Sequence, residues 1–332
     1  MKFLRNNSTD PHFNMSFDEY CLERFPSDDT VFYLWQNSPS VIIGLSQNVY
    51  AEVNLPYLEA NGIKLARRVT GGGAVYHDLQ NLNYTIVGRS NDLDRDYPGY
   101  MHMMLEALRS LGVPAEMNGR NDITVDGRKV SGYAKRVYKD RLMVHGTLMF
   151  DVDLERLTSA LAIPGSKLEA AGIASVRSRV ANLREYLPQF TGIGEFKDAL
   201  ERILSRDYAD PQLFLTPEQE EDIRKICRDK FSTWEWNFGH SPKAQFMQAL
   251  KLPCGKVEIS CSIVHGRIAG AVFGGDFIGS LPAEGIAAAL EGCRFDRAAV
   301  LEAIQGLDVG RCFDGTSAEE LAELFSPVSQ AG

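Results

Sequence analysis

Two arginines followed by three consecutive glycines form the segment best suited to chemistry, Arg67-Arg68-Val69-Thr70-Gly71-Gly72-Gly73. Glycine has no Cβ, so the backbone there can adopt positive φ and let a ligand lie against its N–H groups. Successive N–H groups in such a turn form an anion-binding concavity, and the planar fork of arginine suits a phosphate or a carboxylate. The segment therefore predicts a cradle for an anion at the edge of a sheet.

The residues on either side of this segment leave two interpretations open. Alternating apolar residues at 63–66 and 74–76 predict a strand on each side, so the glycines could serve only the turn of a tight hairpin. The paired arginines and the following His77 and Asp78 favour a binding site instead. Neither G-x-G-x-x-G nor G-x-x-x-x-G-K-S/T is present here, so the segment is neither of the familiar nucleotide-binding loops.

A second segment combines a turn with polar side chains. Asp126-Gly127 stands between two alternating runs, which is a strong signal for a two-residue β-hairpin turn. With that turn Asp122 would face Ser131, and the polar face of the hairpin would carry Asp122, Thr124, Lys129 and Ser131. Such a face could be solvated, or it could direct Lys129 toward the same ligand as the glycines.

The elements that must position these residues alternate between strands and helices. Apolar residues at three- and four-residue spacing predict helices at 14–25, 52–61, 101–111, 153–161, 193–208 and from 216 onward. Apolar and β-branched runs predict strands at 30–35, 41–44, 84–87 and 142–150, and the first two read as neighbouring buried strands. Residues 163–183 suit either a mobile loop that closes over an anion or a plain basic connector.

The composition changes near residues 239–242, which predicts two domains, 1–240 and 245–328. In the second domain Val257, Ile259, Cys261 and Ile263 alternate with polar residues, and a turn at His265-Gly266 leads into another strand. Helical patterns follow at 283–290, 296–304 and 318–325. No chemically suggestive cluster occurs there, so we expect a small accessory α+β domain.

Bulk composition limits the classes of partner. A chain of 332 residues can bury a large core without disulfides or metals. Its net charge of −9 argues against nucleic acid and anionic membranes, although local arginines can still hold a small anion. Six scattered cysteines, without a C-x-x-C pair or metal-ligand spacing, predict free thiols in a reducing compartment and no metal site. With no apolar run that could span a bilayer, the protein is expected to be cytoplasmic.

The sequence resembles the lipoate–protein ligase A family in six motifs that follow one another in the family's order. The matching segments lie at 67–79, 119–122, 128–132, 145–148, 175–180 and 234–239, over essentially the whole chain. The resemblance implies an α/β fold of the α+β type. This is the mixed sheet with flanking helices of biotin–lipoate ligases and class II synthetases, with a small C-terminal domain.

The resemblance also implies a reaction. Lipoate would be activated with ATP and Mg²⁺ to lipoyl-adenylate, and the lipoyl group would pass to a lysine of a lipoyl domain. Acceptors in this family are acyltransferase subunits of 2-oxoacid dehydrogenases and the glycine cleavage H protein. Carboxylate attack on ATP brings two anions together, so the site needs fixed positive charge where they meet.

Roles carried over from the family fall on individual residues of this chain. Lys129 would be the catalytic residue, contacting the lipoate carboxylate and the α-phosphate. ATP and lipoate would be bound by Arg68, Gly71, Gly72, Gly73, Ala74, Val75, Tyr76, His77, Asp122, Lys129, His145, Ser178, Val180 and Ala181. Residues 175–183 would cover the adenylate, and no protein ligand is assigned to Mg²⁺.

Two other functions are possible for a chain with these motifs. Transferases of the same fold use a cysteine nucleophile on a preformed acyl donor, but no cysteine occurs between Cys21 and Cys227. A non-catalytic binding module is disfavoured because Arg68, the three glycines and Lys129 are all present. Leu45, Gln80 and Tyr133 depart from the family pattern, so the preferred acyl-chain length stays open.

Overall fold

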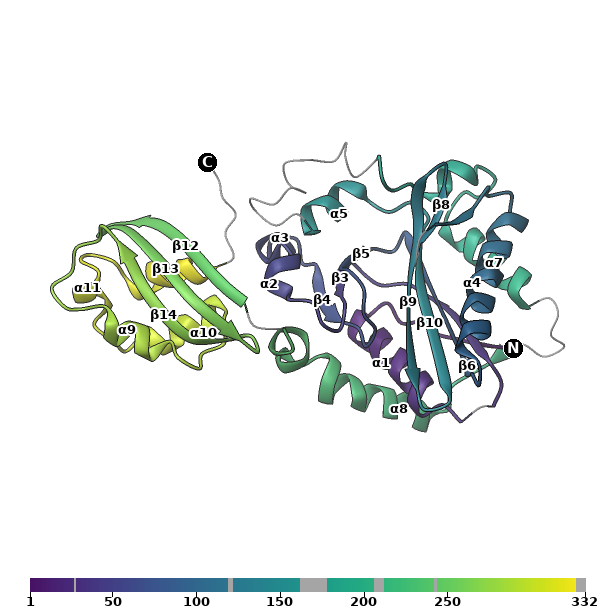
Figure 1. The fold of residues 1–332 in the computed structure, drawn as a ribbon, viewed down its shortest axis with the longest axis horizontal. Coiled ribbons are helices and arrows are strands. Elements are labelled where there is room, and N and C mark those ends of the chain that lie inside the picture. Colours follow the sequence, from purple (N-terminus) through teal and green to yellow (C-terminus); the bar gives the residue numbers. More distant parts are fainter. Residues whose placement is uncertain (27, 119–121, 162–177, 206–211, 242–243, 327–332) are drawn as a thin grey trace. The chain divides into compact units, whose positions relative to one another are not determined.

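The computed structural model describes residues 1–332 except 27, 119–121, 162–177, 206–211, 242–243 and 327–332. The chain divides into two compact units. The first comprises Met1–Leu45 and Leu58–Thr233, and the second comprises Ser46–Tyr57 and Trp234–Gly332 (Figure 1). A short segment of the N-terminal half therefore packs with the C-terminal unit. The domains expected from the sequence, 1–240 and 245–328, stay a prediction.

The first unit is built on an eight-stranded mixed sheet in the order β11-β1-β2-β6-β10-β9-β8-β7. In that order the strands are Gln212–Leu213, Lys2–Leu4, Val31–Trp35, Asn81–Arg89, Arg141–Met149, Arg128–Tyr138, Asp122–Val125 and Glu116–Asn118. β1 runs parallel to β2 and β11, and the other neighbours are antiparallel. The expected mixed sheet is confirmed.

Helices cover both faces of this sheet. Figure 1 shows α4 (Leu93–Ser110) and α7 (Ile193–Ser205) on one side, and α1 (Pro11–Glu23) and α8 (Pro217–Ile226) on the other. On β6 and β10 the side chains alternate, so Leu82, Tyr84, Ile86, Leu142, Val144 and Leu148 join the core under α4 and α7. The residues between them, Asn81, Asn83, Thr85, His145 and Thr147, point to the α1 side, which we call the site face.

A second, three-stranded sheet has the order β4-β3-β5, with strands Lys64–Arg67, Ser40–Ile43 and Val75–His77. Because β3 lies between β4 and β5, the intervening residues 68–74, the glycine loop, cross from one edge of this sheet to the other. The alternative of a tight hairpin is therefore wrong. The expected pairing of β2 with β3 is also wrong, because both strands are fully buried and burial alone does not specify a partner.

The hairpin of β8 and β9 has the expected turn, since Asp126 and Gly127 adopt φ of 51° and 75°. Its register differs further out, because an irregularity in the ladder places Asp122 opposite Gly132 and Ile123 opposite Ser131. Ser131 is consequently fully buried beside the apolar Ile123. The prediction that Ser131 shares the polar face with Lys129 is wrong, because a bulge cannot be read from alternation.

Shorter elements complete the first unit. They are α3 (Leu55–Ala60), α5 (Leu154–Leu161), the 3₁₀ helix Leu183–Tyr186 and a π-helical turn at Cys227–Phe231. The division between the two units falls within α3, after Tyr57. The helix predicted from residue 216 onward is α8, and it begins with a capping box in which Thr216 accepts from the Gln219 N–H. No helix among the described residues is both long and apolar enough to cross a bilayer.

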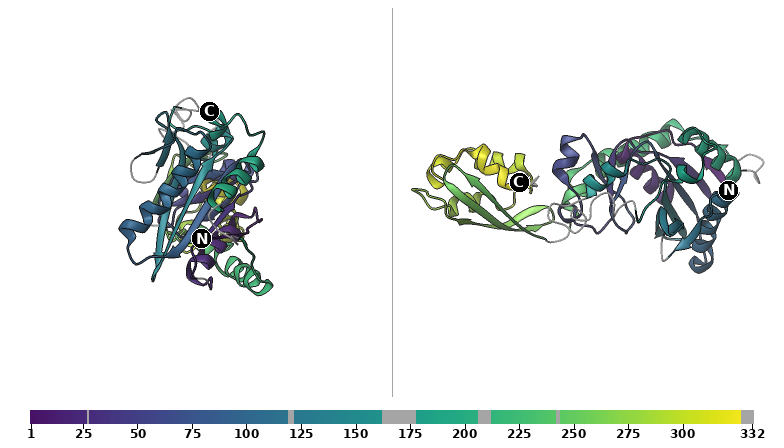
Figure 2. Two further views of the ribbon diagram at one scale, coloured as in Figure 1. Left: turned by 90° about the vertical axis from the view of Figure 1, so that its right-hand side faces the viewer. Right: turned by 90° about the horizontal axis from the view of Figure 1, so that it is seen from above.

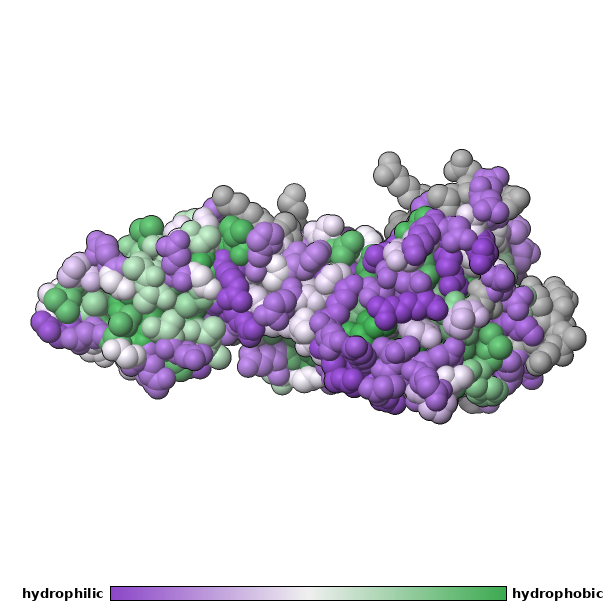
Figure 3. All heavy atoms as spheres, turned by 90° about the horizontal axis from the view of Figure 1, so that it is seen from below, coloured by the Kyte–Doolittle hydropathy of each residue, from purple (hydrophilic) through white to green (hydrophobic). Residues whose placement is uncertain are grey.

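The second unit pairs β12 (Ala244–Leu252), β13 (Gly255–Val264) and β14 (Arg267–Gly275) in an antiparallel sheet. The predicted alternation is confirmed, because Val257, Ile259, Cys261 and Ile263 are all buried. Figure 2 shows helices on one face of this sheet. The helices of the C-terminal segment are α9 (Glu284–Ala289), α10 (Arg297–Ile304), α11 (Val309–Cys312) and α12 (Ala318–Ala322). The segment Ser46–Tyr57, which belongs to the same unit, contributes α2 (Val49–Glu52). In Figure 3 the visible face of this unit is more hydrophobic than that of the first.

We expect the core of the first unit to depend on Phe150, which is fully buried and stacks on Phe196 with ring centroids 5.2 Å apart. Phe150→Ala should lower the free energy of unfolding by about 3–5 kcal/mol, because the truncation leaves a cavity. Phe214→Ala, at a side chain that is 69% exposed, should change it by less than about 0.5 kcal/mol. Urea unfolding followed by circular dichroism measures both, and equal losses would contradict this account of the core.

Candidate functional site

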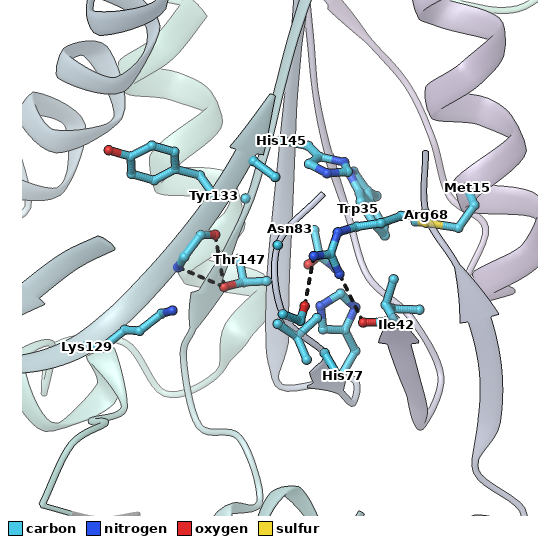
Figure 4. Close-up of a pocket in the computed structure, with 17 residues that line it drawn as sticks. Met15, Trp35, Ile42, Arg68, His77, Asn83, Lys129, Tyr133, His145 and Thr147 are labelled. Atoms are coloured by element: carbon cyan, nitrogen blue, oxygen red, sulfur yellow. Dashed lines mark hydrogen bonds between the residues drawn. The ribbon is translucent and has the colours of Figure 1, made fainter. Parts of the chain in front are cut away.

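A pocket lies in the first unit between the site face of the large sheet, the small sheet and the glycine loop (Figure 4). The large sheet contributes Trp35, Asn83, Lys129, Gly132, Tyr133, Ala134, His145, Gly146 and Thr147. Arg68, Gly72, Gly73 and Ala74 come from the glycine loop, Ile42, Val75 and His77 from the small sheet, and Met15 from α1.

The strand register orders the lining residues across the sheet. Thr147 of β10 lies opposite Asn83 of β6, which in turn lies opposite Trp35 of β2. Lys129 belongs to β9, the strand on the other side of β10. At about 4.8 Å per strand, Lys129 and Trp35 stand roughly 14 Å apart across the sheet. Lys129 therefore stands at one end of the pocket, and the apolar Met15, Trp35 and Ile42 stand at the other end beside the guanidinium of Arg68 (Figure 4).

The two arginines of the glycine segment hold protein backbone. Arg68 Nε donates to Thr70 Oγ1 at 3.0 Å, Nη1 donates to the Ile42 carbonyl, and Nη2 donates to the carbonyls of Gly71 and Gly73. Arg67 is fully buried and donates to the Gly44 carbonyl. Burial lowers the pKa of Arg68 to about 10, so it remains charged at neutral pH. Arg68 thus brings positive charge to the pocket while its hydrogen bonds shape the glycine loop.

Close packing explains part of the glycine requirement. Gly72 has φ of +96°, a conformation that other residues rarely adopt. A Cβ on Gly44, at the end of β3, would lie 2.2 Å from the Gly72 carbonyl oxygen. Gly71 and Gly73 have open space around the position of a Cβ. The constraint to glycine therefore falls on Gly44, because of close packing, and on Gly72, because of its backbone conformation.

A buried network ties the glycine loop to the large sheet. Thr70 Oγ1 lies 2.7 Å from His145 Nε2, and His145 Nδ1 lies 2.7 Å from Asp18 Oδ2. The other carboxylate oxygen of Asp18 accepts hydrogen bonds from the hydroxyls of Tyr33 and Thr85. All five side chains are buried, so the network positions the loop through interactions that water does not weaken.

The histidine that follows the glycines is also fixed. His77 is 3% exposed, lines the pocket, and places Nδ1 3.1 Å from Asn37 Nδ2. Burial lowers the pKa of His77 to about 3, and the nearby charges of Arg68 and His145 act in the same direction. The imidazole is therefore neutral throughout the physiological pH range.

Lys129 stands beside a carboxylate and beside the segment 179–181. Its Nζ lies 2.8 Å from Asp122 Oδ1, and Gly132 leaves room for the ammonium because a Cβ there would lie 2.8 Å from it. Its N–H donates to the Arg179 carbonyl, and its carbonyl accepts from the Ala181 N–H. Lys129 therefore lies on a strand that is hydrogen-bonded to β8 on one side and to residues 179–181 on the other. Its side chain is about one-third exposed.

The predicted site residues fall into two groups. Those that line the pocket are Arg68, Gly72, Gly73, Ala74, Val75, His77, Lys129 and His145. Those that do not are Gly71, Tyr76, Asp122, Ser178, Val180 and Ala181, although Asp122 contacts Lys129 and Val180 bridges to it. Residues 175–177 of the expected covering loop, and 119–121, lie outside the described residues.

Sequence reasoning missed several residues that shape this site. They are Met15, Asp18, Trp35, Ile42, Thr70, Asn83, Gly132, Ala134, Gly146 and Thr147. The polar residues at alternate positions of β6 were a usable signal, because a strand buried along nearly its whole length rarely carries them without a purpose. Of the three departures from the family pattern, only Tyr133 lines the pocket. The described residues contain no group of three or more side chains suited to hold a metal ion.

The buried network should be a measurable part of the stability. We expect His145→Ala to lower the free energy of unfolding by about 2–3 kcal/mol, because Asp18 and Thr70 lose a partner inside the protein. His102→Ala is the matched control, since that side chain is 68% exposed, and it should stay within about 0.5 kcal/mol. Equal effects of the two substitutions in urea unfolding would contradict a structural role for the network.

The low pKa of His77 can be tested by spectroscopy. With its pKa lowered to about 3 from the ordinary value of 6.5, the His77 imidazole stays neutral as the pH falls toward 5. Nitrogen NMR of histidine-labelled protein should show that the imidazole signal lost in His77→Phe does not titrate between pH 5 and 8. Titration of that signal near pH 6.5 would overturn the assignment.

Sequence models of two protein families match the chain. One, described as the lipoyl protein ligase A/B catalytic domain, matches residues 10–205. The other, described as the bacterial lipoate protein ligase C-terminus, matches residues 241–325. Lipoate–protein ligase 1 of Staphylococcus aureus is 38% identical over 328 residues, which span 98% of this chain and all of that protein.

Solved structures agree with these matches. A bipartite lipoate–protein ligase of Thermoplasma acidophilum, studied with its E2 lipoyl domain, is 32% identical with a TM-score of 0.65, covering 72% of this chain and 96% of that one. A lipoate–protein ligase A bound with ATP is 31% identical with a TM-score of 0.62, covering 72% and 98% respectively. The resemblance found in the motifs is confirmed, and the chain belongs to the lipoyl protein ligase A/B family.

Proposed function

We propose that this protein activates lipoate with ATP and transfers the lipoyl group to a lysine of an acceptor protein. The observation that carries the proposal is a pocket with an ammonium at one end and apolar side chains at the other. Such a pocket suits a molecule with a carboxylate head and an apolar tail. The names of the relatives, and the ATP bound to one of them, supply the substrates.

In the first step an oxygen of the lipoate carboxylate attacks the α-phosphorus of ATP. The bond to the leaving pyrophosphate breaks, and lipoyl-adenylate forms. Both reactants are negative, so a cation at their meeting point stabilises the transition state more than the separated reactants. Lys129 occupies that position, and its pairing with Asp122 holds the ammonium beside the pocket before the anions arrive.

The glycine loop would form the opposite wall of the reaction site. Gly72 and Gly73 line the pocket with backbone, and Arg68 adds its buried charge. Mg²⁺ would enter as part of the substrate, because phosphate oxygens and water are its preferred ligands.

In the second step the amine of the acceptor lysine attacks the carbonyl carbon of the adenylate, an amide forms, and AMP leaves. No enzyme thiol is needed. Among the described residues no cysteine lines the pocket, and burial raises the pKa of Cys21, the thiol nearest in sequence to the pocket residue Met15. These observations support the ligase over a transferase that relays the acyl group through cysteine.

The acceptor would be a lipoyl domain, as in the E2 protein studied with the T. acidophilum relative. Within that class we propose the acyltransferase subunits of 2-oxoacid dehydrogenases, the glycine cleavage H protein, or both. A cytoplasmic location, which the six free thiols favour, also stays a proposal.

Replacement of Lys129 tests the proposed chemistry. Lys129→Ala should lower kcat/KM for pyrophosphate release from ATP and lipoate by a factor of about 10²–10³, because the developing charge loses its fixed cation. Lys135→Ala is the matched control on the same strand, where the ammonium lies over the Tyr97 ring outside the pocket. That variant should retain activity within about threefold.

A loss shared equally by Lys129→Ala and Lys135→Ala would contradict a specific role for Lys129. Mass spectrometry of the products, with and without an apo lipoyl domain, separates the two steps. A wild-type chain that releases no pyrophosphate from ATP and lipoate would contradict the proposed function itself.

A further inference from the structure

Two buried polar groups of the pocket lie at the end away from Lys129. His77 Nε2 and Asn83 Nδ2 are both inaccessible to water, and neither has a hydrogen-bond partner among the described residues. Both residues line the pocket together with the apolar Met15, Trp35 and Ile42. A buried donor without a partner costs free energy, so a ligand that can accept from it gains affinity by binding there.

The neighbours of His77 determine which ring nitrogen carries the proton. Asn14 Nδ2 donates to the backbone carbonyls of Ser8 and Gln36, which fixes the orientation of that amide. The same nitrogen lies 2.8 Å from Asn37 Oδ1 and shares its two hydrogens among the three acceptors, so Asn37 presents its NH₂ group to His77. The Nδ1 atom of His77 is therefore an acceptor, and the single proton of the neutral ring resides on Nε2.

The position of these groups matches the tail of an acyl substrate. Asn83 lies on β6, two strands from the β9 strand that carries Lys129, a separation of roughly 10 Å across the sheet. His77 and Trp35 pack edge to face with ring centroids 6.2 Å apart, so the histidine lies at the same end of the pocket. A carboxylate held at Lys129 would direct the remote end of its chain toward them.

We infer that His77, with Asn83, selects an acyl substrate whose tail accepts a hydrogen bond over one with a plain hydrocarbon tail. The inference rests on the proposed function, and it assigns the dithiolane sulfur of lipoate as the acceptor. Divalent sulfur is a weak acceptor, so the interaction tunes the choice of substrate and leaves the adenylation chemistry to Lys129. Octanoate fills the same apolar space but leaves both donors unpaired.

The test compares two substrates in the same protein. In His77→Phe the ring remains and the donor is lost, so kcat/KM for pyrophosphate release should fall about fivefold with lipoate. With octanoate it should change less than about twofold, so the preference for lipoate falls. Asn83→Leu should act in the same direction. His102→Phe, on the exposed surface, should leave both values unchanged.

The remaining outcomes distinguish a purely structural role of His77 from a failure of the proposed function. Equal losses with both acids in His77→Phe would show a structural role and overturn the inference. Where that variant does not fold, nitrogen NMR of the wild-type chain replaces it. The His77 Nε2 signal should then move on addition of lipoate and not of octanoate, and equal movement would overturn the inference. A wild type inactive with both acids would instead refute the proposed function.

Discussion

The structure depends on bringing positive charge to a place that is partly closed to water. Lys129 supplies a partly exposed ammonium on β9, and Arg68 supplies a buried guanidinium whose hydrogen bonds are directed at backbone carbonyls. The two cations have different roles. Arg68 gives the glycine loop its shape and adds a fixed field, while the Lys129 ammonium is about one-third exposed and pairs with Asp122, which leaves it able to contact substrate in the proposed reaction.

The buried network beneath the loop explains how a glycine-rich segment can be a precise wall. Three glycines in succession have high conformational entropy in the unfolded chain, so the loop needs strong anchors to adopt one shape. Thr70, His145 and Asp18 provide them from three separate elements, namely the glycine loop, β10 and α1. The polar residues of the site face thereby serve two functions, positioning the loop and lining the pocket.

Much of this organisation could be predicted from the sequence, and the failures have physical causes. Turn chemistry is local, so the Asp126-Gly127 turn was predicted correctly, as was the start of a helix near residue 216. The site motifs also named residues that the fold brings together, because Lys129, Arg68, His77 and His145 all line one pocket.

Strand partners and bulges are not local. The separation of β2 from β3 and the burial of Ser131 depend on contacts that one sequence does not reveal. The positions of Asp18 and Asn83 were missed for the same reason, since only the fold brings Asp18 to His145 and Asn83 to the pocket that the glycine loop lines.

The most direct test of the account is a single-turnover reaction in the absence of any acceptor protein. Enzyme in excess is mixed with ATP, Mg²⁺ and lipoate, quenched, and analysed for pyrophosphate and adenylate by mass spectrometry. We expect one equivalent of pyrophosphate and one of enzyme-bound lipoyl-adenylate for each lipoate consumed. Transfer of a lipoyl group from a preformed donor, with no pyrophosphate formed from ATP and lipoate, would contradict the account.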